Sequence, residues 1–304
     1  MSVYNAYMKL HGAIDAEVLR DARLSRRTTY RVGGPAALLV TCNTYRALVR
    51  CLEVLADEDV PWVVLGKGSN VLASDDGYAG CVVVLGREFQ RSAVEGTRVT
   101  AGAGVALSKL VNDMLSRELS GLEGCVGIPG TLGGALRMNA GTRLEWIGSL
   151  VRDLVVLREH EGLVRLSASD VAWGYRSTSI PESDIVLEAT LELTPGHKAE
   201  MSANMERRLM RRRVTQPLGS PSCGSVFKNP DDGRAVGRLI EECGLKGYRV
   251  GGAAVSHVHA NFIVNEGDAT ASDVLAVMRH VRDTVGEAYG IDLQPEVRLL
   301  GFSS

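Results

Sequence analysis

The most informative stretch of this sequence is Gly127-Ile128-Pro129-Gly130-Thr131-Leu132-Gly133-Gly134-Ala135. Its proline fixes one backbone dihedral angle, and its four glycines carry no side chain that would keep a ligand away from the backbone. A segment of this kind can wrap a pyrophosphate or the edge of a flat ring system, although an ordinary glycine-rich turn has the same composition.

A second glycine-rich loop, Gly66-Lys67-Gly68-Ser69-Asn70, follows the short apolar run 62–65. It differs from a Rossmann fingerprint, which would require a third glycine at Val71, and it has no Gly-Lys-Ser/Thr ending at the spacing of a Walker A loop. Consecutive backbone N–H groups in such a loop can still form a nest for an anion. The two loops together favour a dinucleotide bound on a fold other than the Rossmann fold.

Bulk composition narrows the classes of function. The chain has 304 residues, 45% hydrophobic and 23% charged, which suits two or three packed lobes. A formal net charge of -2 and an aromatic content of 5% disfavour a nucleic-acid binder. The N-terminus has no apolar region typical of a secretory signal, and no run of about 18 apolar residues predicts a membrane span.

The six cysteines lie singly, without a Cys-x-x-Cys pair. This pattern indicates buried free thiols in a reducing cytosol rather than a zinc site. We therefore expect a cytoplasmic protein that binds no metal.

Hydrophobic periodicity predicts a mixed α+β chain. Strands are expected at 36–41, 62–65, 81–85, 99–102, 151–158, 163–166 and 185–193. Helices are expected at 44–58, 107–118, 199–213, 235–243 and 271–289. The turn Pro195-Gly196 closes the strand-rich part, so we place a domain boundary there. Residues 1–196 would form one region, with subdomains at about 1–86 and 87–196, and residues 197–304 a second domain.

Motifs spread in order along nearly the whole chain resemble those of one enzyme family. They are Thr28-Thr29-Tyr30-Arg31-Val32-Gly33-Gly34-Pro35-Ala36, the two glycine loops, Met138-Asn139-Ala140-Gly141, Gly174-Tyr175-Arg176, Cys223-Gly224-Ser225-Val226-Phe227-Lys228-Asn229-Pro230 and Gln294-Pro295-Glu296-Val297-Arg298. The family is that of UDP-N-acetylenolpyruvoylglucosamine reductase. The resemblance implies an α+β fold with PCMH-type (vanillyl-alcohol-oxidase-like) FAD-binding lobes, followed by a C-terminal α+β substrate-binding domain.

The resemblance also implies the activity. Non-covalent FAD would carry a hydride from NADPH, a co-substrate, to the enolpyruvyl ether of a nucleotide sugar, with no metal, nucleic acid or membrane as partner. The implied cofactor-binding residues are Gly66, Lys67, Gly68, Ser69, Asn70, Gly127, Ile128, Pro129, Gly130, Thr131, Gly133, Gly134 and Ala135.

Three residues match catalytic positions of the family. Arg176 can pair with the substrate carboxylate through two hydrogen bonds. Ser225 matches the residue that protonates the carbanionic carbon, and Glu296 matches a glutamate that either acts on the carboxylate-bearing intermediate or orients Arg176. Taken without the motifs, each of the three fits a surface ion pair, a turn or a solvated strand better.

Tyr175, Lys228 and Asn229 are expected to bind substrate. Only 49 residues (225 − 176) separate Arg176 from Ser225, which resembles the shorter subtype lacking an inserted loop with a substrate-binding tyrosine. Tyr175 is therefore expected to take part of that role. Lys228 either stabilises the Ser225 alkoxide or binds substrate phosphate, and Asn229 is expected at the diphosphate.

Two segments depart from the family pattern. Residues 142–147 replace a small glycine-rich stretch, which puts the local flavin contacts in question. After Arg176, Thr178 supplies a hydroxyl, but the aromatic ring usual in the family is missing.

Alternatives remain at one motif and for the function. His257 and His259 have a spacing that suits a metal on one face of a strand, whereas the family motif favours packing, or a place near the flavin, for His259. Rival functions are another PCMH-type flavin oxidoreductase and a non-catalytic nucleotide-sugar-binding relative. Retention of all three catalytic positions argues against both.

Overall fold

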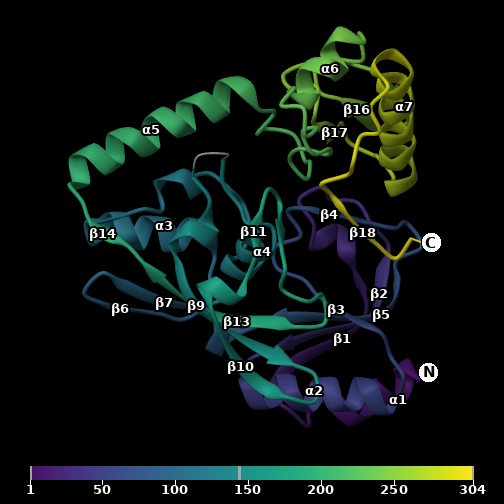
Figure 1. The fold of residues 1–304 in the computed structure, drawn as a ribbon. Coiled ribbons are helices and arrows are strands. Elements are labelled where there is room, and N and C mark those ends of the chain that lie inside the picture. Colours follow the sequence, from purple (N-terminus) through teal and green to yellow (C-terminus); the bar gives the residue numbers. More distant parts are fainter. Residues whose placement is uncertain (1, 143–144, 303–304) are drawn as a thin grey trace. The chain divides into compact units, whose positions relative to one another are not determined.

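The computed structural model describes residues 2–142 and 145–302 (Figure 1). The chain folds into two compact units, each assembled from separate stretches of sequence. The first unit contains Met1–Val18, Leu39–Gly66 and Val82–Met210, and the second unit contains Leu19–Leu38, Lys67–Cys81 and Arg211–Ser304. No helix in the described ranges is both long enough and apolar enough to cross a bilayer.

Figure 1 labels the main elements. The α-helices are α1 (Val3–Leu10), α2 (Tyr45–Asp57), α3 (Leu107–Ser116), α4 (Leu132–Arg137), α5 (Lys198–Thr215), α6 (Val236–Glu242) and α7 (Ala271–Tyr289). The strands are β1 (Ala16–Arg23), β2 (Pro35–Cys42), β3 (Trp62–Val64), β4 (Val71–Ala73), β5 (Tyr78–Leu85), β6 (Ser92–Glu95), β7 (Arg98–Gly102), β8 (Leu119–Ser120), β9 (Val151–Arg158), β10 (Gly162–Ser167), β11 (Trp173–Gly174), β12 (Ser177–Thr178), β13 (Ile185–Glu192), β14 (Thr194–Pro195), β15 (Arg249–Val250), β16 (Ala253–Val255), β17 (Ile263–Asn265) and β18 (Arg298–Leu300).

A five-stranded antiparallel sheet of the first unit has the order β10-β9-β13-β7-β6. Half-buried and exposed residues alternate along the edge strand β10, whereas the central strand β13 is buried over most of its length. Helix α4 packs against β7 and β13, and it carries the 127–135 loop onto this sheet.

A four-stranded sheet has the order β1-β2-β5-β3, and the residues of β1, β2 and β5 are divided between the two units. Helix α2 follows β2, and its N-cap is Thr44, whose hydroxyl accepts the N–H of Ala47 at 3.1 Å. Leu48, Cys51 and Leu55 lie on its buried face at helical spacing.

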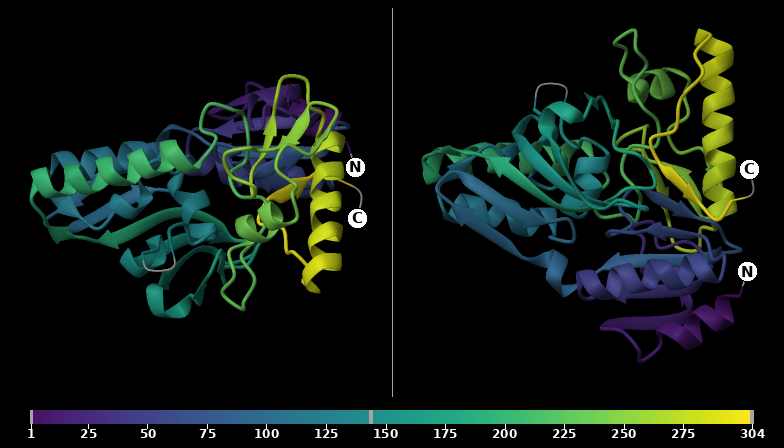
Figure 2. Two further views of the ribbon diagram at one scale, coloured as in Figure 1. Left: turned by 90° about the horizontal axis from the view of Figure 1, so that it is seen from above. Right: turned by 60° about the horizontal axis from the view of Figure 1, so that its bottom comes forward.

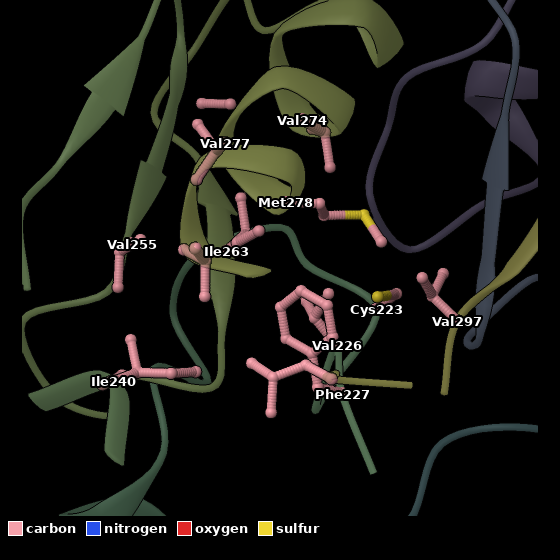
Figure 3. Packing of buried hydrophobic residues seen from close by; sticks show 14 of the residues in the cluster. Cys223, Val226, Phe227, Ile240, Val255, Ile263, Val274, Val277, Met278 and Val297 are labelled. Carbon is pink, nitrogen blue, oxygen red and sulfur yellow. The ribbon is translucent and has the colours of Figure 1, made fainter. Parts of the chain in front are cut away.

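In the second unit, α7 packs on the antiparallel sheet β15-β16-β17 (Figure 2). Thr270 and Asp273 form a capping box at the start of α7, and Gly290, with φ at +67°, ends the helix. The core of this unit joins helix residues to strand and loop residues, among them Cys223, Val226, Phe227, Ile240, Val255, Ile263, Val274, Val277, Met278 and Val297 (Figure 3).

The C-terminal strand also belongs to this second unit. Strand β18 pairs in parallel with β4, so that Arg298 lies opposite Val71 and Leu300 opposite Ala73. One compact unit therefore contains both 67–81 and 211–304, although residues 82–210 of the first unit lie between them in the sequence. The sequence-based boundaries near 86 and 196 stay a prediction.

The predicted secondary structure is confirmed element by element, with ends that differ by at most three residues. Helices α1 and α4, strands β1, β4 and β6 and several two-residue strands were not expected. Most residues of β1 are exposed, so its sequence lacks the apolar alternation that marks a half-buried strand.

Candidate active site

The two glycine-rich loops meet in the first unit, at Gly66. A Cβ on Gly66 would lie 2.7 Å from Oγ1 of Thr131, so only a residue without a side chain permits this approach. Leu132 and Gly133 donate their N–H groups to carbonyl oxygens of the 103–105 turn, at 2.9 and 2.8 Å. The glycine-containing turn 103–105 therefore holds the 127–135 loop through two backbone hydrogen bonds.

Most backbone N–H groups of this loop are used within the protein, and that of Ile128 donates to the carbonyl oxygen of Cys125 at 3.1 Å. The N–H groups of residues 132–134 all have acceptors within the protein, and Ala135 is buried. Gly127 and Gly130 have φ angles of +72° and +136°, a region that favours glycine. Gly127 is exposed and Gly130 is half-buried, so this part of the loop offers backbone without side chains, which fits the phosphates or ring edge of a flavin dinucleotide.

Residues 67–70 belong to the second unit, where Gly68 fixes the loop. Gly68 has φ at +58°, and a Cβ there would lie 2.2 Å from the carbonyl oxygen of Arg27. Its own carbonyl oxygen accepts the N–H of Thr29 at 3.1 Å. Lys67 is exposed and Ser69 is half-buried. The loop thus rests on the Thr28–Ala36 motif, and two motifs far apart in sequence form one local structure.

Tyr175 and Arg176 are the two loop residues of a tight hairpin in the first unit, between β11 and β12. Arg176 has φ at +52°, a left-handed conformation in which turns normally place glycine or asparagine. For an arginine this conformation costs about 1–2 kcal/mol, and such strain is typical of functional positions. Nη1 of Arg176 donates to the carbonyl oxygen of Gly141 at 2.9 Å, and Cζ lies 5.4 Å from the Tyr175 ring centroid.

Asn139 holds this hairpin in place, a role that we did not assign from the sequence. Its amide nitrogen donates to the carbonyl oxygen of Gly174 at 2.9 Å, and its amide oxygen accepts the N–H of Gly148 at 3.0 Å. Asn139 is only 4% exposed and has φ at +41°. The Asn-Ala-Gly motif therefore supports Arg176 from both ends, through Asn139 and through Gly141.

Of the atypical segment 142–147, the structure describes Thr142 and residues 145–147, and Arg143 and Leu144 are outside the described residues. Thr142 donates its N–H to the Glu145 carbonyl oxygen at 2.7 Å, and its hydroxyl accepts the Glu145 N–H at 3.2 Å. The Glu145 carboxylate pairs with Arg208 of α5. The backbone of Trp146 forms an antiparallel bridge with that of Gly141, and Trp146 is 37% exposed.

The hydroxyl expected after Arg176 has a structural contact. Thr178 Oγ1 donates to the carbonyl oxygen of Arg137 at 3.5 Å, which links β12 to the end of α4.

Ser225 and Glu296 lie on paired segments of the second unit. The N–H of Glu296 donates to the carbonyl oxygen of Val226 at 2.7 Å, and Phe227 forms a bridge with Pro295. The segment that follows Ser225 therefore runs alongside the segment that carries Glu296. Both Ser225 and Glu296 are half-buried, so each keeps part of its surface accessible.

Lys228 and Asn229 continue this segment. The backbone N–H of Lys228 donates to the carbonyl oxygen of Gln294 at 2.8 Å. Lys228 as a whole is half-buried. The amide oxygen of Asn229 accepts the N–H of Val236, the first residue of α6, at 3.0 Å. Asn229 thus has a structural contact beside the substrate role expected from its sequence.

Asn261, in the motif that also contains His259, fixes the same strand. Its amide oxygen accepts the N–H of Phe227 at 3.0 Å, and its amide nitrogen donates to the Phe227 carbonyl oxygen at 2.9 Å. The His259 ring packs against Phe262, with 4.9 Å between ring centroids, and its Nδ1 accepts the N–H of Asn261. Burial lowers the pKa of His259, and the charge of Lys246 acts in the same direction. His257 packs instead against Gly247.

The charge of Glu296 acts on a buried thiol, that of Cys223. Burial raises the pKa of Cys223 to about 12, and the charge of Glu296 acts in the same direction. Cys223 is next to the buried Tyr30, whose pKa burial also raises. The thiol of Cys223 and the phenol of Tyr30 are therefore both neutral near pH 7.

Comparisons with known proteins define the class first. A model of an FAD-binding domain matches residues 36–159, which include Gly66 and the 127–135 loop. A model described as the C-terminal domain of UDP-N-acetylenolpyruvoylglucosamine reductase matches residues 216–300, which include Ser225 and Glu296. The chain is thus an α+β flavoprotein of the expected PCMH-type class, with a distinct C-terminal domain.

Relatives then identify the family. The chain is 44% identical over 285 residues to UDP-N-acetylenolpyruvoylglucosamine reductase 2 of Symbiobacterium thermophilum, an alignment that covers 93% of this chain and 92% of the relative. It is 44% identical over 288 residues to the reductase of Anaeromyxobacter sp., covering 95% and 90%. The crystal structure of the Thermus caldophilus reductase superposes with a TM-score of 0.81 at 36% identity, covering 94% of this chain and 99% of that one. This chain belongs to the UDP-N-acetylenolpyruvoylglucosamine reductase family.

Proposed function

We propose that this chain reduces UDP-N-acetylenolpyruvoylglucosamine to UDP-N-acetylmuramate, with NADPH as reductant and bound FAD as cofactor, in peptidoglycan precursor synthesis. The observation that carries this proposal is the pairing of the segments that carry Ser225 and Glu296, through the 2.7 Å hydrogen bond from the N–H of Glu296 to the carbonyl oxygen of Val226. A serine and a glutamate carried on adjacent segments suit protonation of a carbanion next to a carboxyl group. Relatives named as this reductase, aligned along nearly the whole chain, support the substrate.

FAD would be held by Gly66, Lys67, Gly68, Ser69 and Asn70 together with residues 127–131. When bound, it supplies hydride transfer from NADPH to the terminal methylene carbon of the enolpyruvyl group. Gly133, Gly134 and Ala135 would contribute by holding the loop rather than by donating N–H groups to phosphate, because those donors are already used within the protein.

Arg176 would bind the substrate carboxylate. Once the methylene carbon gains a hydride, negative charge develops on the adjacent carbon and spreads into the carboxylate. A guanidinium with two parallel N–H groups stabilises this charge, and the hairpin that carries it is already fixed by Asn139 and Gly141. Tyr175, 41% exposed beside Arg176, would contact the same substrate.

Ser225 would give its proton to the carbanionic carbon, which completes the addition of hydride and proton across the double bond. Glu296 would hold or protonate the carboxylate-bearing intermediate. Lys228 would stabilise the resulting Ser225 alkoxide or bind substrate phosphate, and Asn229 would contact the diphosphate.

The domain division that we propose is 1–196 for the FAD-binding region and 197–304 for the substrate-binding domain, supported by the two domain-model matches. We also propose a cytoplasmic location. Its support is that the six cysteines are free thiols, five of them buried, as in proteins of a reducing compartment.

An anaerobic titration followed by visible absorbance tests the proposal. NADPH should bleach the flavin band of the FAD-loaded protein, and UDP-N-acetylenolpyruvoylglucosamine should restore it. Ser225→Ala should leave bleaching unchanged and slow the recovery by about 10²–10⁴-fold, the usual contribution of a general acid. Flavin that bleaches but is not reoxidised by this substrate in the parent protein would favour another flavin oxidoreductase. Protein that binds FAD and substrate without either redox step would favour a non-catalytic relative.

A further inference from the structure

Asn70 ends the first glycine loop, yet its side chain is directed at the segment that carries Glu296. Its amide nitrogen donates to the carbonyl oxygen of Glu296 at 2.9 Å, across 226 positions of sequence. The carbonyl oxygen of Asn70 accepts the N–H of Arg298 at 3.0 Å, and the β4–β18 pairing begins at the next residue, Val71. All these residues belong to the second unit.

Glu296 is held on its other side by the segment that follows Ser225. Its N–H donates to the Val226 carbonyl oxygen at 2.7 Å, and the neighbouring Gln294 accepts the N–H of Lys228 at 2.8 Å. Both backbone polar groups of Glu296 are therefore bonded, one to each neighbouring segment. This arrangement fixes the direction of its Cα–Cβ bond and hence the region that the carboxylate can reach.

We propose that Asn70 is a positioning residue for Glu296, and that it connects the loop expected to hold the flavin to the carboxylate expected to act on the substrate. The inference rests on the proposed function, in which Glu296 contacts the substrate. An asparagine suits this role because its amide donates to a backbone carbonyl oxygen, which an aspartate of the same shape cannot do. Asn261 holds the paired segment in the same way, through the backbone of Phe227, so the segments that carry Ser225 and Glu296 are each bonded by an asparagine amide.

Two substitutions remove the donor in different ways. Asn70→Asp keeps the size of the side chain and replaces its donor with an acceptor, and Asn70→Ala removes the group without adding charge. Asn265→Asp is the matched control, because the amide nitrogen of Asn265 also donates to a backbone carbonyl oxygen of the second unit, that of Tyr30, at 3.0 Å. The amide oxygen of Asn265 accepts the N–H groups of Gly267 and Ala269. These three partners all lie outside residues 294–298. Asn265→Asp therefore reports the effect of losing an asparagine hydrogen bond in the second unit without a direct change at Glu296.

The first measurement separates the two half-reactions by stopped flow in FAD-loaded protein. Both Asn70 variants are first saturated with FAD, because Asn70 is also expected at the flavin, and reoxidation is compared with bleaching by NADPH in the same protein. Reoxidation by substrate should slow by about tenfold to a hundredfold more than bleaching does, the scale that a misplacement of about 1 Å produces. The loss should appear in the limiting rate rather than in the half-saturating substrate concentration. Asn265→Asp should reoxidise at the parent rate.

The second measurement is amide hydrogen exchange, which needs no activity. Peptides covering 295–298 should exchange faster in both Asn70 variants than in the parent, while peptides of α7 stay unchanged. Equal slowing of reoxidation by Asn265→Asp, or unchanged exchange at 295–298 in the Asn70 variants, would overturn the positioning role. If the parent flavin is not reoxidised by the substrate at all, the proposed function fails, and the exchange result alone decides whether Asn70 holds Glu296.

Discussion

Replacing Asn139 by alanine should destabilise the first unit strongly. The substitution removes the acceptor of the buried Gly148 N–H and the donor to the Gly174 carbonyl oxygen, bonds of 3.0 and 2.9 Å. Leaving a buried polar partner unsatisfied costs about 1–3 kcal/mol each, and the positive φ of residue 139 adds about 1 kcal/mol for a residue other than glycine or asparagine. Because Gly174 is half-buried and water can replace part of its bond, we expect about 3–4 kcal/mol in total.

Urea unfolding followed by tryptophan fluorescence measures this loss. The three tryptophans, Trp62, Trp146 and Trp173, all belong to the first unit, so the signal reports that unit. A slope of about 1–3 kcal/mol per molar urea converts the expected loss into a midpoint lower by about 1 M or more.

Two further variants separate the causes. Asn139→Gly removes both hydrogen bonds but tolerates the positive φ, and Asn139→Asp keeps the acceptor for Gly148. We expect the loss of stability to decrease from alanine to glycine to aspartate. In the same variants the half-saturating substrate concentration should rise, because Gly174 leads into the hairpin of Arg176. A midpoint for Asn139→Ala within about 0.3 M of the parent would show that these two bonds do not hold the hairpin.

Three other predictions concern the second unit. Asp75→Ala should increase hydrogen exchange at the start of α7 and lower the free energy of unfolding by about 1–2 kcal/mol, because the Asp75 carboxylate accepts the first two N–H groups of that helix at 2.7 and 2.9 Å. Asp76→Ala, at the next position, should change neither quantity. Gly77→Ala should cost about 2–5 kcal/mol in thermal unfolding, since φ is +84° and a Cβ would lie 1.9 Å from a backbone oxygen, whereas Gly219→Ala, in open space, should stay within about 0.5 kcal/mol. Because the pKa of His259 is lowered in the folded protein, the unfolded chain binds a proton at this histidine more tightly. The contribution of neutral His259 to stability is therefore complete above about pH 6.5 and is lost as the pH falls below that value. His259→Gln should flatten this pH dependence in urea unfolding followed by circular dichroism, and an unchanged slope would contradict the reasoning.

Much of the fold was accessible from local sequence patterns. Helical spacing of apolar residues located α2 and α7, and short apolar runs located β9 and β13, because each of these elements buries one face or one stretch against a core. Strand β1 escaped prediction for the same reason, since its exposed residues leave no such pattern. The motifs in their order likewise sufficed to indicate the family, which the relatives then showed.

The arrangement around the candidate site was not accessible in that way. Residue types at Arg176, Ser225 and Glu296 could be chosen from motifs, but nothing near them in sequence predicts the left-handed turn at Arg176 or the amide contacts of Asn139, Asn261 and Asn70. Periodicity and capping signals reach only about four residues along the chain, the span of one helical turn or one tight turn. The contacts of these asparagines join residues 9 to 226 positions apart, and they form only once packing brings separate segments together and each buried polar group requires a partner.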